Sequence, residues 1–210
     1  MQKNAILATT DDKPLSKRGQ RILDVAQTFF YQQGYDETSL AMIIEQAGGS
    51  RRSIYAEFGN KQGLLMAVVQ RQVQSQTEIL TQINRSLDVK TALNQVSFNF
   101  VQGMLSPELM ALFRLAVQQV VKCPELGKMI YHKGPITGIL PLVDYLAWLK
   151  AEKVLRIDDC HFSAQILLEM AKGPLHTQCL LLPDKKITDE EIVEQVAKVV
   201  NLFLKSHCSE

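Results

Sequence analysis

Two arginines and a tyrosine lie close together near the middle of the first hundred residues, in a segment that predicts a short helix. Ile54 and Phe58 are four residues apart and would share its inward face, whereas Arg51, Arg52 and Tyr55 would lie on a different face. Arginine can make two hydrogen bonds to guanine, and tyrosine can donate to phosphate or pack on a thymine methyl group. A solvated helix end is the plain alternative. Positive charge at a helix N-terminus slightly destabilises the helix. Two arginines at this position therefore favour a functional role, here DNA contact, over a structural one.

The charge of the whole chain requires that any such contact be local. The 210 residues carry 23 Lys and Arg against 22 Asp and Glu, a formal net charge of +1. Bulk charge therefore does not drive binding to nucleic acid or membrane. The stretch from Ser50 to Lys61, by contrast, holds three basic residues and one acidic residue. Residues 62–210 carry 15 basic and 15 acidic residues and give no sign of a second nucleic-acid surface.

Other side chains that carry chemistry form no recognisable site. The four cysteines show no paired spacing, which predicts free thiols in a reducing cytoplasm. The spacing of His132, His161 and His176 does not place two ligands on one helical face, so we expect no metal and no cofactor. Common hydrolase, zinc-protease and nucleotide-binding motifs are absent, and no apolar run approaches the roughly 18 residues of a membrane span. We expect a cytoplasmic protein without membrane partners that is not an enzyme.

The elements that position the arginines and the tyrosine are predicted to be helices. Helical periodicity runs from Ser16 onward without sustained alternation, which predicts an all-α fold of about nine to ten helices. Gly34 and the pair Gly48-Gly49 separate three short helices in the first 60 residues. A tight break between the second and third helices predicts a helix-turn-helix head. The predicted parts are a flexible arm (1–15), a helix-turn-helix DNA-binding domain (16–62) and a ligand-binding and dimerisation domain (63–210).

The remainder of the chain divides at its prolines and glycines into a larger helical bundle. A long helix is predicted from Lys61 to about residue 84. Gly173-Pro174 predicts an irregularity inside a later helix. Thr188, followed three residues later by Glu191, is a capping-box pattern that opens the last helix. The other helices are predicted over about residues 90–105, 107–122, 124–132, 136–152 and 159–182.

The first part of the chain resembles the DNA-binding domain of TetR-family transcriptional regulators. The resemblance covers about residues 16–66 and is carried by residues 22–26 (ILDVA), the Gly34-Tyr35 turn, residues 38–48 (TSLAMIIEQAG) and residues 50–65 (SRRSIYAEFGNKQGLL). Two positions depart from the family pattern. Gly49 stands where a small apolar residue, often valine, is common, and Ile44 stands where alanine is common. We expect these departures to affect the fine geometry of the turn and of the small core.

The resemblance implies a role in DNA contact for several residues. Thr38 or Ser39 would contact phosphate from the start of the second helix, and Lys61 would hold a phosphate. Lys17, Arg18 and Arg21 could touch the DNA backbone or simply face solvent. The residues implied to face the major groove or its flanking phosphates are Ser50, Arg51, Arg52, Ser53 and Tyr55.

The second part resembles, more loosely, the C-terminal domain of AefR-like regulators, through residues 112–115, 123–126, 134–135 and 142–146. Regulators of this family use such a domain to dimerise and to bind a small inducer. Apolar residues of the last two helices are dimer-interface candidates, although they could instead be protomer core: Ile166, Met170, Ile192, Val196, Val199 and Phe203. An inducer, expected to be largely apolar, would meet aromatic, methionine and polar side chains: Phe98, Met104, Phe113, Trp148, Met170 and His176.

Three functions remain open from the sequence. The leading hypothesis is a homodimeric, ligand-responsive repressor that binds a pseudo-palindromic site on double-stranded DNA. In that hypothesis, ligand binding shifts the fourth helix and changes the spacing of the two recognition helices. The alternatives are an all-helical enzyme and a DNA-binding regulator without a small-molecule ligand.

Overall fold

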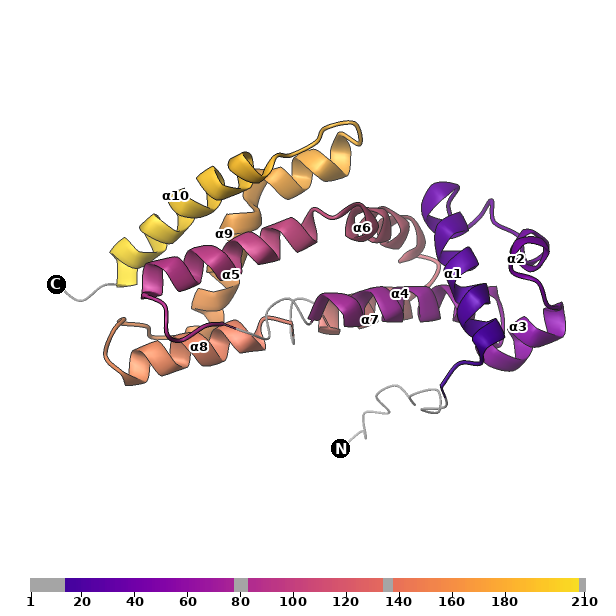
Figure 1. Ribbon diagram of the computed structural model, residues 1–210, viewed down its shortest axis with the longest axis horizontal. Helices are drawn as coiled ribbons and strands as arrows, with labels where there is room; N and C mark the ends of the chain where they lie inside the picture. The colour runs from indigo at the N-terminus through magenta and orange to yellow at the C-terminus, as the bar shows by residue number, and fades with distance from the viewer. Residues whose placement is uncertain (1–13, 78–82, 134–137, 208–210) are drawn as a thin grey trace. The chain divides into compact units, whose positions relative to one another are not determined.

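The computed structural model describes residues 14–77, 83–133 and 138–207, and over these residues the chain forms ten α-helices and no strand (Figure 1). The all-α prediction is therefore confirmed. The chain divides after Val68 into two compact units, which are described separately below. Two predictions fall wholly or partly outside the described residues: the N-terminal arm and the start of the helix over 136–152. The long helix predicted to about residue 84 is described as far as Thr77, and residues 83 and 84 are not helical.

The first unit consists of α1 (Lys17–Gln32), α2 (Leu40–Ala47), α3 (Arg51–Phe58) and the first turns of α4 (Lys61–Thr77). Each of the first three helices begins after a serine whose hydroxyl accepts a hydrogen bond from a backbone N–H three residues later: Ser16, Ser39 and Ser50. Such caps satisfy backbone donors that a helix start would otherwise leave unpaired. The three helices pack on one another through their buried apolar residues.

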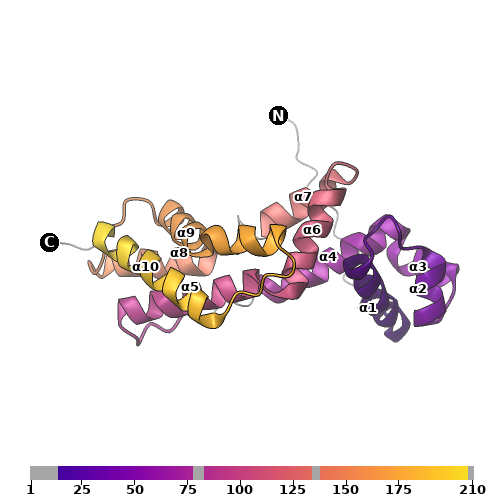
Figure 2. The same ribbon diagram turned by 90° about the horizontal axis from the view of Figure 1, so that it is seen from above.

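The second unit contains the rest of α4 and six further helices: α5 (Val89–Met104), α6 (Pro107–Gln119), α7 (Pro124–Tyr131), α8 (Leu140–Ala151), α9 (Cys160–Leu181) and α10 (Asp189–His207). α9 is central, because α5, α6, α8 and α10 all pack against it, and α5 also packs along α10 (Figure 2). Among the described residues no single helix is long and apolar enough to cross a bilayer. α5 and α6 meet that criterion only as a pair, by length and composition, across a 58° bend.

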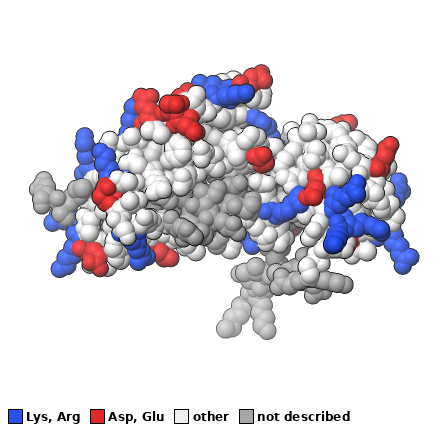
Figure 3. Space-filling view, in the orientation of Figure 1, with Lys and Arg blue, Asp and Glu red and all other residues white. Residues whose placement is uncertain are grey.

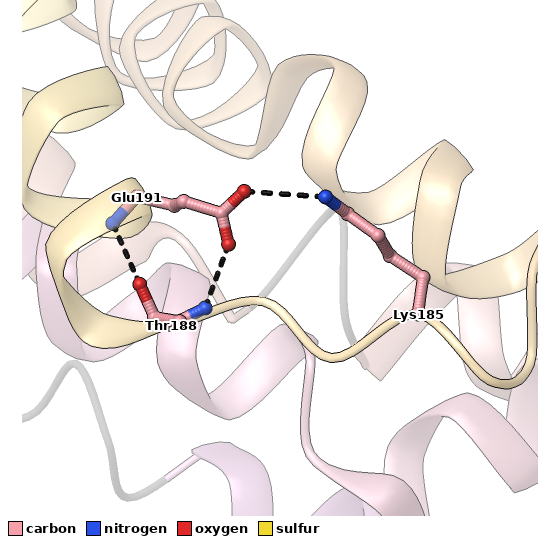
Figure 4. A network of polar contacts seen from close by, with 3 residues as sticks. All are labelled: Lys185, Thr188 and Glu191. Atoms are coloured by element: carbon pink, nitrogen blue, oxygen red, sulfur yellow. Dashed lines mark hydrogen bonds and ion pairs between the residues drawn. The ribbon is translucent and has the colours of Figure 1, made fainter.

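The predicted capping box at the start of α10 is confirmed (Figure 4). The backbone N–H of Thr188 donates to a carboxylate oxygen of Glu191 at 2.9 Å, and the N–H of Glu191 donates to the Thr188 hydroxyl at 3.3 Å. Lys185 lies 3.3 Å from the other carboxylate oxygen of Glu191. The box fixes where the last helix begins, because two backbone donors of its first turn are satisfied reciprocally.

The irregularity predicted inside α9 is also confirmed, at Gly173 with φ 36° and ψ −135°. Pro174 has no N–H, so the carbonyl of Met170 lacks its usual donor four residues later. The side-chain amide of Gln195, on α10, donates to that carbonyl at 3.1 Å instead. A tertiary hydrogen bond thus stabilises the break and connects it to the last helix.

Candidate nucleic-acid interface and ligand cavity

The recognition-helix candidate α3 has one buried face and one exposed cationic face. Ile54 and Phe58 are buried, whereas Arg51 and Arg52 are exposed and the Tyr55 side chain is 54% exposed. In Figure 3, Lys and Arg side chains gather over the first unit with few acidic side chains among them. The N-terminal turn of α3 therefore presents positive charge, an aromatic ring and backbone N–H groups to solvent, which together suit a polyanion.

The two serines at the start of α3 organise that turn. The Ser50 hydroxyl accepts from the backbone N–H of Ser53 at 3.3 Å, and the two hydroxyls lie 3.2 Å apart. Ser50 is exposed and Ser53 is half-buried. The first turn therefore brings together four of the five residues predicted to face the groove, Ser50 to Ser53, and Tyr55 follows in the next turn.

A carboxylate that the sequence reasoning missed connects α3 to α1. Glu57 lies about half a helical turn around α3 from Tyr55, given ~100° per residue. It accepts hydrogen bonds from the backbone N–H of Ser16 at 3.1 Å and from the Ser16 hydroxyl at 2.7 Å. A side chain at Gly19 would have its Cβ only 1.8 Å from a Glu57 oxygen, so only glycine leaves room for this contact. We call Ser16, Gly19 and Glu57 the helix clamp.

The helix clamp also supplies charge that α1 lacks in its own sequence. The first turn of α1 has no acidic residue and begins with Lys17 and Arg18, although a helix N-terminus favours negative charge. Glu57 provides that negative charge from another helix. In the sequence, the one sign of a close approach was Gly19 in the first turn of α1. Ser16 and Glu57 are separated by 41 positions, so local patterns could not indicate the pair.

The turn between α2 and α3 requires glycine at two successive positions. Gly48 has φ +75° and Gly49 has φ +110°, a region that L-residues rarely adopt. A Cβ at Gly49 would also lie 3.3 Å from Cδ of Arg18, which extends across the turn from α1. Valine, common in the family at this position, would be strained here. Glycine at position 49, where the family often has valine, thus allows the positive φ angle that the backbone adopts in this turn.

The ammonium of Lys61 lies at the turn between α1 and α2. Its Nζ is 4.3 Å from the centroid of the Tyr35 ring and 3.5 Å from the carbonyl oxygen of Asp36. Burial lowers the pKa of Lys61, and the nearby Asp36 and Glu37 carboxylates oppose that shift. Lys61 therefore joins the start of α4 to the α1–α2 turn, and its predicted phosphate contact would come in addition to this role.

The structure corrects one predicted phosphate contact. Thr38 is only 1% exposed, and its hydroxyl donates to the carbonyl of Gly34 at 2.7 Å. Its side chain therefore stabilises the turn between α1 and α2 and has no surface for DNA. Ser39 is exposed at the N-cap of α2 and remains the candidate there.

The second unit contains a largely apolar cavity of about 400 Å³. This volume is at the lower end of the ~300–1,000 Å³ typical of small-ligand pockets. Met104 and Phe113, two of the six predicted ligand contacts, line it, and so does Val73 of α4. On the α9 side its wall includes three polar side chains missed by the sequence reasoning, Gln165, Glu169 and Lys172. Their spacing of four and three residues on one helix was the available signal.

The other predicted ligand contacts lie elsewhere. Phe98, Trp148 and Met170 are partly buried against the main hydrophobic core and do not line the cavity, which corrects those predictions. Trp148, for instance, follows Tyr145 by three residues on α8, and the two rings are tilted by 34° with their centroids 5.7 Å apart. His176 is also absent from the lining; its ring meets the Phe113 ring edge-on at 4.9 Å.

The structure also corrects four of the predicted interface residues. Their apolar face of α10 is directed into the protomer, where it packs with α5 and α9: Ile192, Val196, Val199 and Phe203 are all buried. Ile166 is exposed and Met170 is partly exposed, so both remain interface candidates. Phe162, one turn before Ile166, is 59% exposed and was missed.

No metal site forms within residues 14–77, 83–133 and 138–207, where no three His, Cys, Asp or Glu side chains are grouped closely enough to hold an ion. Cys160 and Cys179 are free thiols. Cys208 lies outside the described residues.

Comparison with known proteins agrees with this geometry in both units. A family model described as bacterial regulatory proteins of the tetR family matches residues 22–68, and one described as the AefR-like transcriptional repressor C-terminal domain matches residues 91–207. The HTH-type transcriptional repressor ComR of Escherichia coli K12 is 47% identical over 51 residues, which is 24% of each chain. The matched segment thus spans about a quarter of that curated relative.

Solved structures extend the likeness of fold to nearly the whole chain. A TetR-family transcriptional regulator of Mesorhizobium loti is similar with a TM-score of 0.84 and 20% identity, over 94% of this chain and 100% of that one. The flavonoid-responsive regulator FrrA is similar with a TM-score of 0.79 and 24% identity, over 92% of this chain and 98% of its own. Since the AefR-like model alone covers more than half of the residues, the chain belongs to the TetR family of bacterial transcriptional regulators.

Proposed function

We propose that the protein is a transcriptional repressor that binds double-stranded DNA through the exposed N-terminal end of α3. The observation that carries this proposal is the division of α3 into a buried face, with Ile54 and Phe58, and an exposed face, with Arg51, Arg52 and Tyr55. Recognition helices present base-reading side chains from their N-terminal residues to the major groove. The family, and the names of related repressors, support the same function.

Repression would require two copies of the chain on one site. A single helix-turn-helix head makes few contacts, whereas a symmetric dimer reads two half-sites about one DNA turn apart. On α9, Phe162 and Ile166 form an exposed apolar stripe opposite the buried Ala164, Leu167 and Leu168. Partly exposed Met170 continues this stripe, which supports α9 as part of the dimer interface.

The cavity would receive the ligand that controls DNA binding. Helix α4 supports this coupling, because it begins with Lys61 in the first unit and carries Val73, a cavity-lining residue, in the second. A ligand that favours one position of α4 would shift the population of DNA-competent dimers in proportion to its differential affinity. The flavonoid-responsive regulator of similar fold is an example of a ligand-responsive member.

The experiment is a gel shift of the purified full-length protein against DNA from upstream of its own gene, at two salt concentrations and with excess nonspecific competitor. We expect a discrete, competitor-resistant complex that weakens with salt, because phosphate contacts release counterions. Tyr55→Ala should weaken the complex. Arg51→Ala should cost about 1–3 kcal/mol and relax sequence preference at one base pair.

The matched control removes an exposed arginine from the second unit. Arg156 is exposed on the chain segment before α9, and its backbone N–H donates to the carbonyl of His207 at 2.8 Å. Arg156→Ala should leave the shift unchanged. Equal losses from Arg51→Ala and Arg156→Ala would contradict the assignment of α3 as the recognition helix. Failure to recover any specific fragment from a genome-wide selection of bound DNA would contradict the function itself.

A further inference from the structure

The buried part of the cavity lining is apolar over the residues that the structure describes. Its side chains, which we call the apolar floor, are each at most 6% exposed: Val73, Leu109, Leu112, Ile139 and Leu168. None of these side chains can donate or accept a hydrogen bond. A polar group of a ligand placed against the apolar floor would lose its hydrogen bonds to water without replacement, which is costly. The floor therefore suits the apolar part of a ligand.

The two charged side chains of the α9 wall compensate each other. Nζ of Lys172 lies 2.9 Å from each carboxylate oxygen of Glu169, and both residues line the cavity. Lys133, the other charged lining residue, also has an interaction partner. An anionic ligand would compete with Glu169 for the ammonium, and a cationic ligand would compete with Lys172 for the carboxylate. Since a charge that loses hydration requires a compensating charge, the α9 wall favours an ionised ligand of neither sign.

The α9 wall can still form hydrogen bonds to an uncharged group. An ammonium has three N–H donors, so the two oxygens of Glu169 leave at least one donor of Lys172 for a ligand. Gln165, which lies one turn before Glu169 and also lines the cavity, adds an amide that can both donate and accept. A hydroxyl, carbonyl or amide of a ligand would thus find partners on α9 while the ion pair stays intact.

We propose that the cavity binds a neutral molecule with an apolar body and a hydrogen-bonding group at one end only. The body lies against the apolar floor, and the polar end meets Gln165 and the Lys172–Glu169 pair. This inference rests on the ligand role proposed for the cavity and specifies its chemistry. The ion pair acts in specificity, because each member cancels the charge with which the other would select an ionised ligand.

Calorimetric titration of the full-length protein at neutral pH with four probes of equal chain length tests this proposal: 1-octanol, 1,8-octanediol, octanoate and octylamine. We expect 1-octanol to bind most tightly. The diol should bind at least about tenfold more weakly, because its second hydroxyl meets the apolar floor. Octanoate and octylamine are both ionised at neutral pH and should also bind at least about tenfold more weakly, because each loses hydration without gaining a free counter-charge.

Two variants expose one charge of the pair at a time. Glu169→Gln leaves the ammonium of Lys172 without its counter-ion, so octanoate affinity should rise at least about tenfold relative to that of 1-octanol. Lys172→Met leaves the carboxylate unpaired, so octylamine affinity should rise by a similar factor. Glu194→Gln is the matched control, because Glu194 pairs with Lys198 at 2.6 Å on α10 and neither residue lines the cavity. It should leave the relative affinities of the probes unchanged.

The possible failures are distinguishable. Binding of octanoate or octylamine to the parent protein as tightly as 1-octanol would overturn the neutral class of ligand. Equal affinities for the diol and 1-octanol would overturn the orientation set by the apolar floor. Unchanged selectivity in Glu169→Gln or in Lys172→Met would overturn the role of the ion pair. Absence of binding by all four probes would overturn both this inference and the proposed ligand role of the cavity, while the DNA-binding function is judged by the gel shift alone.

Discussion

Replacement of Glu57 by alanine tests whether the helix clamp orients the recognition helix. The substitution removes two hydrogen bonds to Ser16, at 2.7 and 3.1 Å, and the negative charge beside the first turn of α1. Both partners are accessible to solvent, so each hydrogen bond contributes about 1 kcal/mol. The charge at the helix N-terminus adds ~0.3–1 kcal/mol. The expected loss is about 2–3 kcal/mol, enough to change an equilibrium constant by about thirtyfold or more.

Simple electrostatics predicts the opposite effect on DNA binding. Removal of an acid from α3 should by itself strengthen attraction to any phosphate backbone. If the clamp holds α3 at the angle that its base contacts need, Glu57→Ala instead weakens specific binding, by about tenfold or more, and leaves nonspecific binding unchanged or tighter. The ratio of specific to nonspecific affinity is therefore the informative quantity.

Fluorescence anisotropy with the selected operator and with scrambled DNA of equal length measures both affinities, and urea unfolding measures stability. Glu45→Ala, which removes an exposed acid from α2, is the matched control and should not reduce the specificity ratio. Ser16→Ala should cost less in the Glu57→Ala background than in the parent, because the two residues share a contact. An unchanged or improved specificity ratio in Glu57→Ala would refute the positioning role.

For three further substitutions, the structure predicts whether stability or DNA binding rises or falls. Gly49→Val places a side chain at φ +110°, which should lower the free energy of unfolding by about 1–3 kcal/mol, measured in urea, and weaken operator binding. A variant as stable as the parent would contradict a strained backbone in this turn. Gln195→Leu removes the donor to the Met170 carbonyl, so the melting temperature should fall by about 2–4 °C, with the exposed Gln118→Leu as control. Burial lowers the pKa of His176 below its usual 6.5. As the pH falls below 6.5, the unfolded chain therefore takes up a proton on His176 before the folded chain does, and the free energy of unfolding decreases. His176→Phe should flatten the dependence of stability on pH between about 5 and 7, and an unchanged slope would reject this origin.

Features that depend on neighbours a few residues apart were predictable from the sequence. The serine caps, the glycine breaks, the Thr188–Glu191 capping box and the irregularity at Gly173-Pro174 are all local, so residue type and spacing suffice to indicate them. The division of α3 into an apolar and a cationic face follows from helical periodicity in the same way. The all-α fold and the family followed from these local signals together with the resemblance of the helix-turn-helix segment.

Features that depend on which surfaces meet were decided only by the tertiary structure. The apolar stripe of α10 has the same pattern whether it meets another copy or its own protomer, and packing with α5 and α9 buries Val196 and Phe203 in the protomer. Thr38 is next to an exposed N-cap serine in the sequence, but the fold of the α1–α2 turn buries it. Glu57 meets Ser16 across 41 residues, a separation that no local rule covers. Periodicity shows that a face is apolar or charged, and the tertiary structure alone determines its partner, because the partner comes from a distant part of the chain.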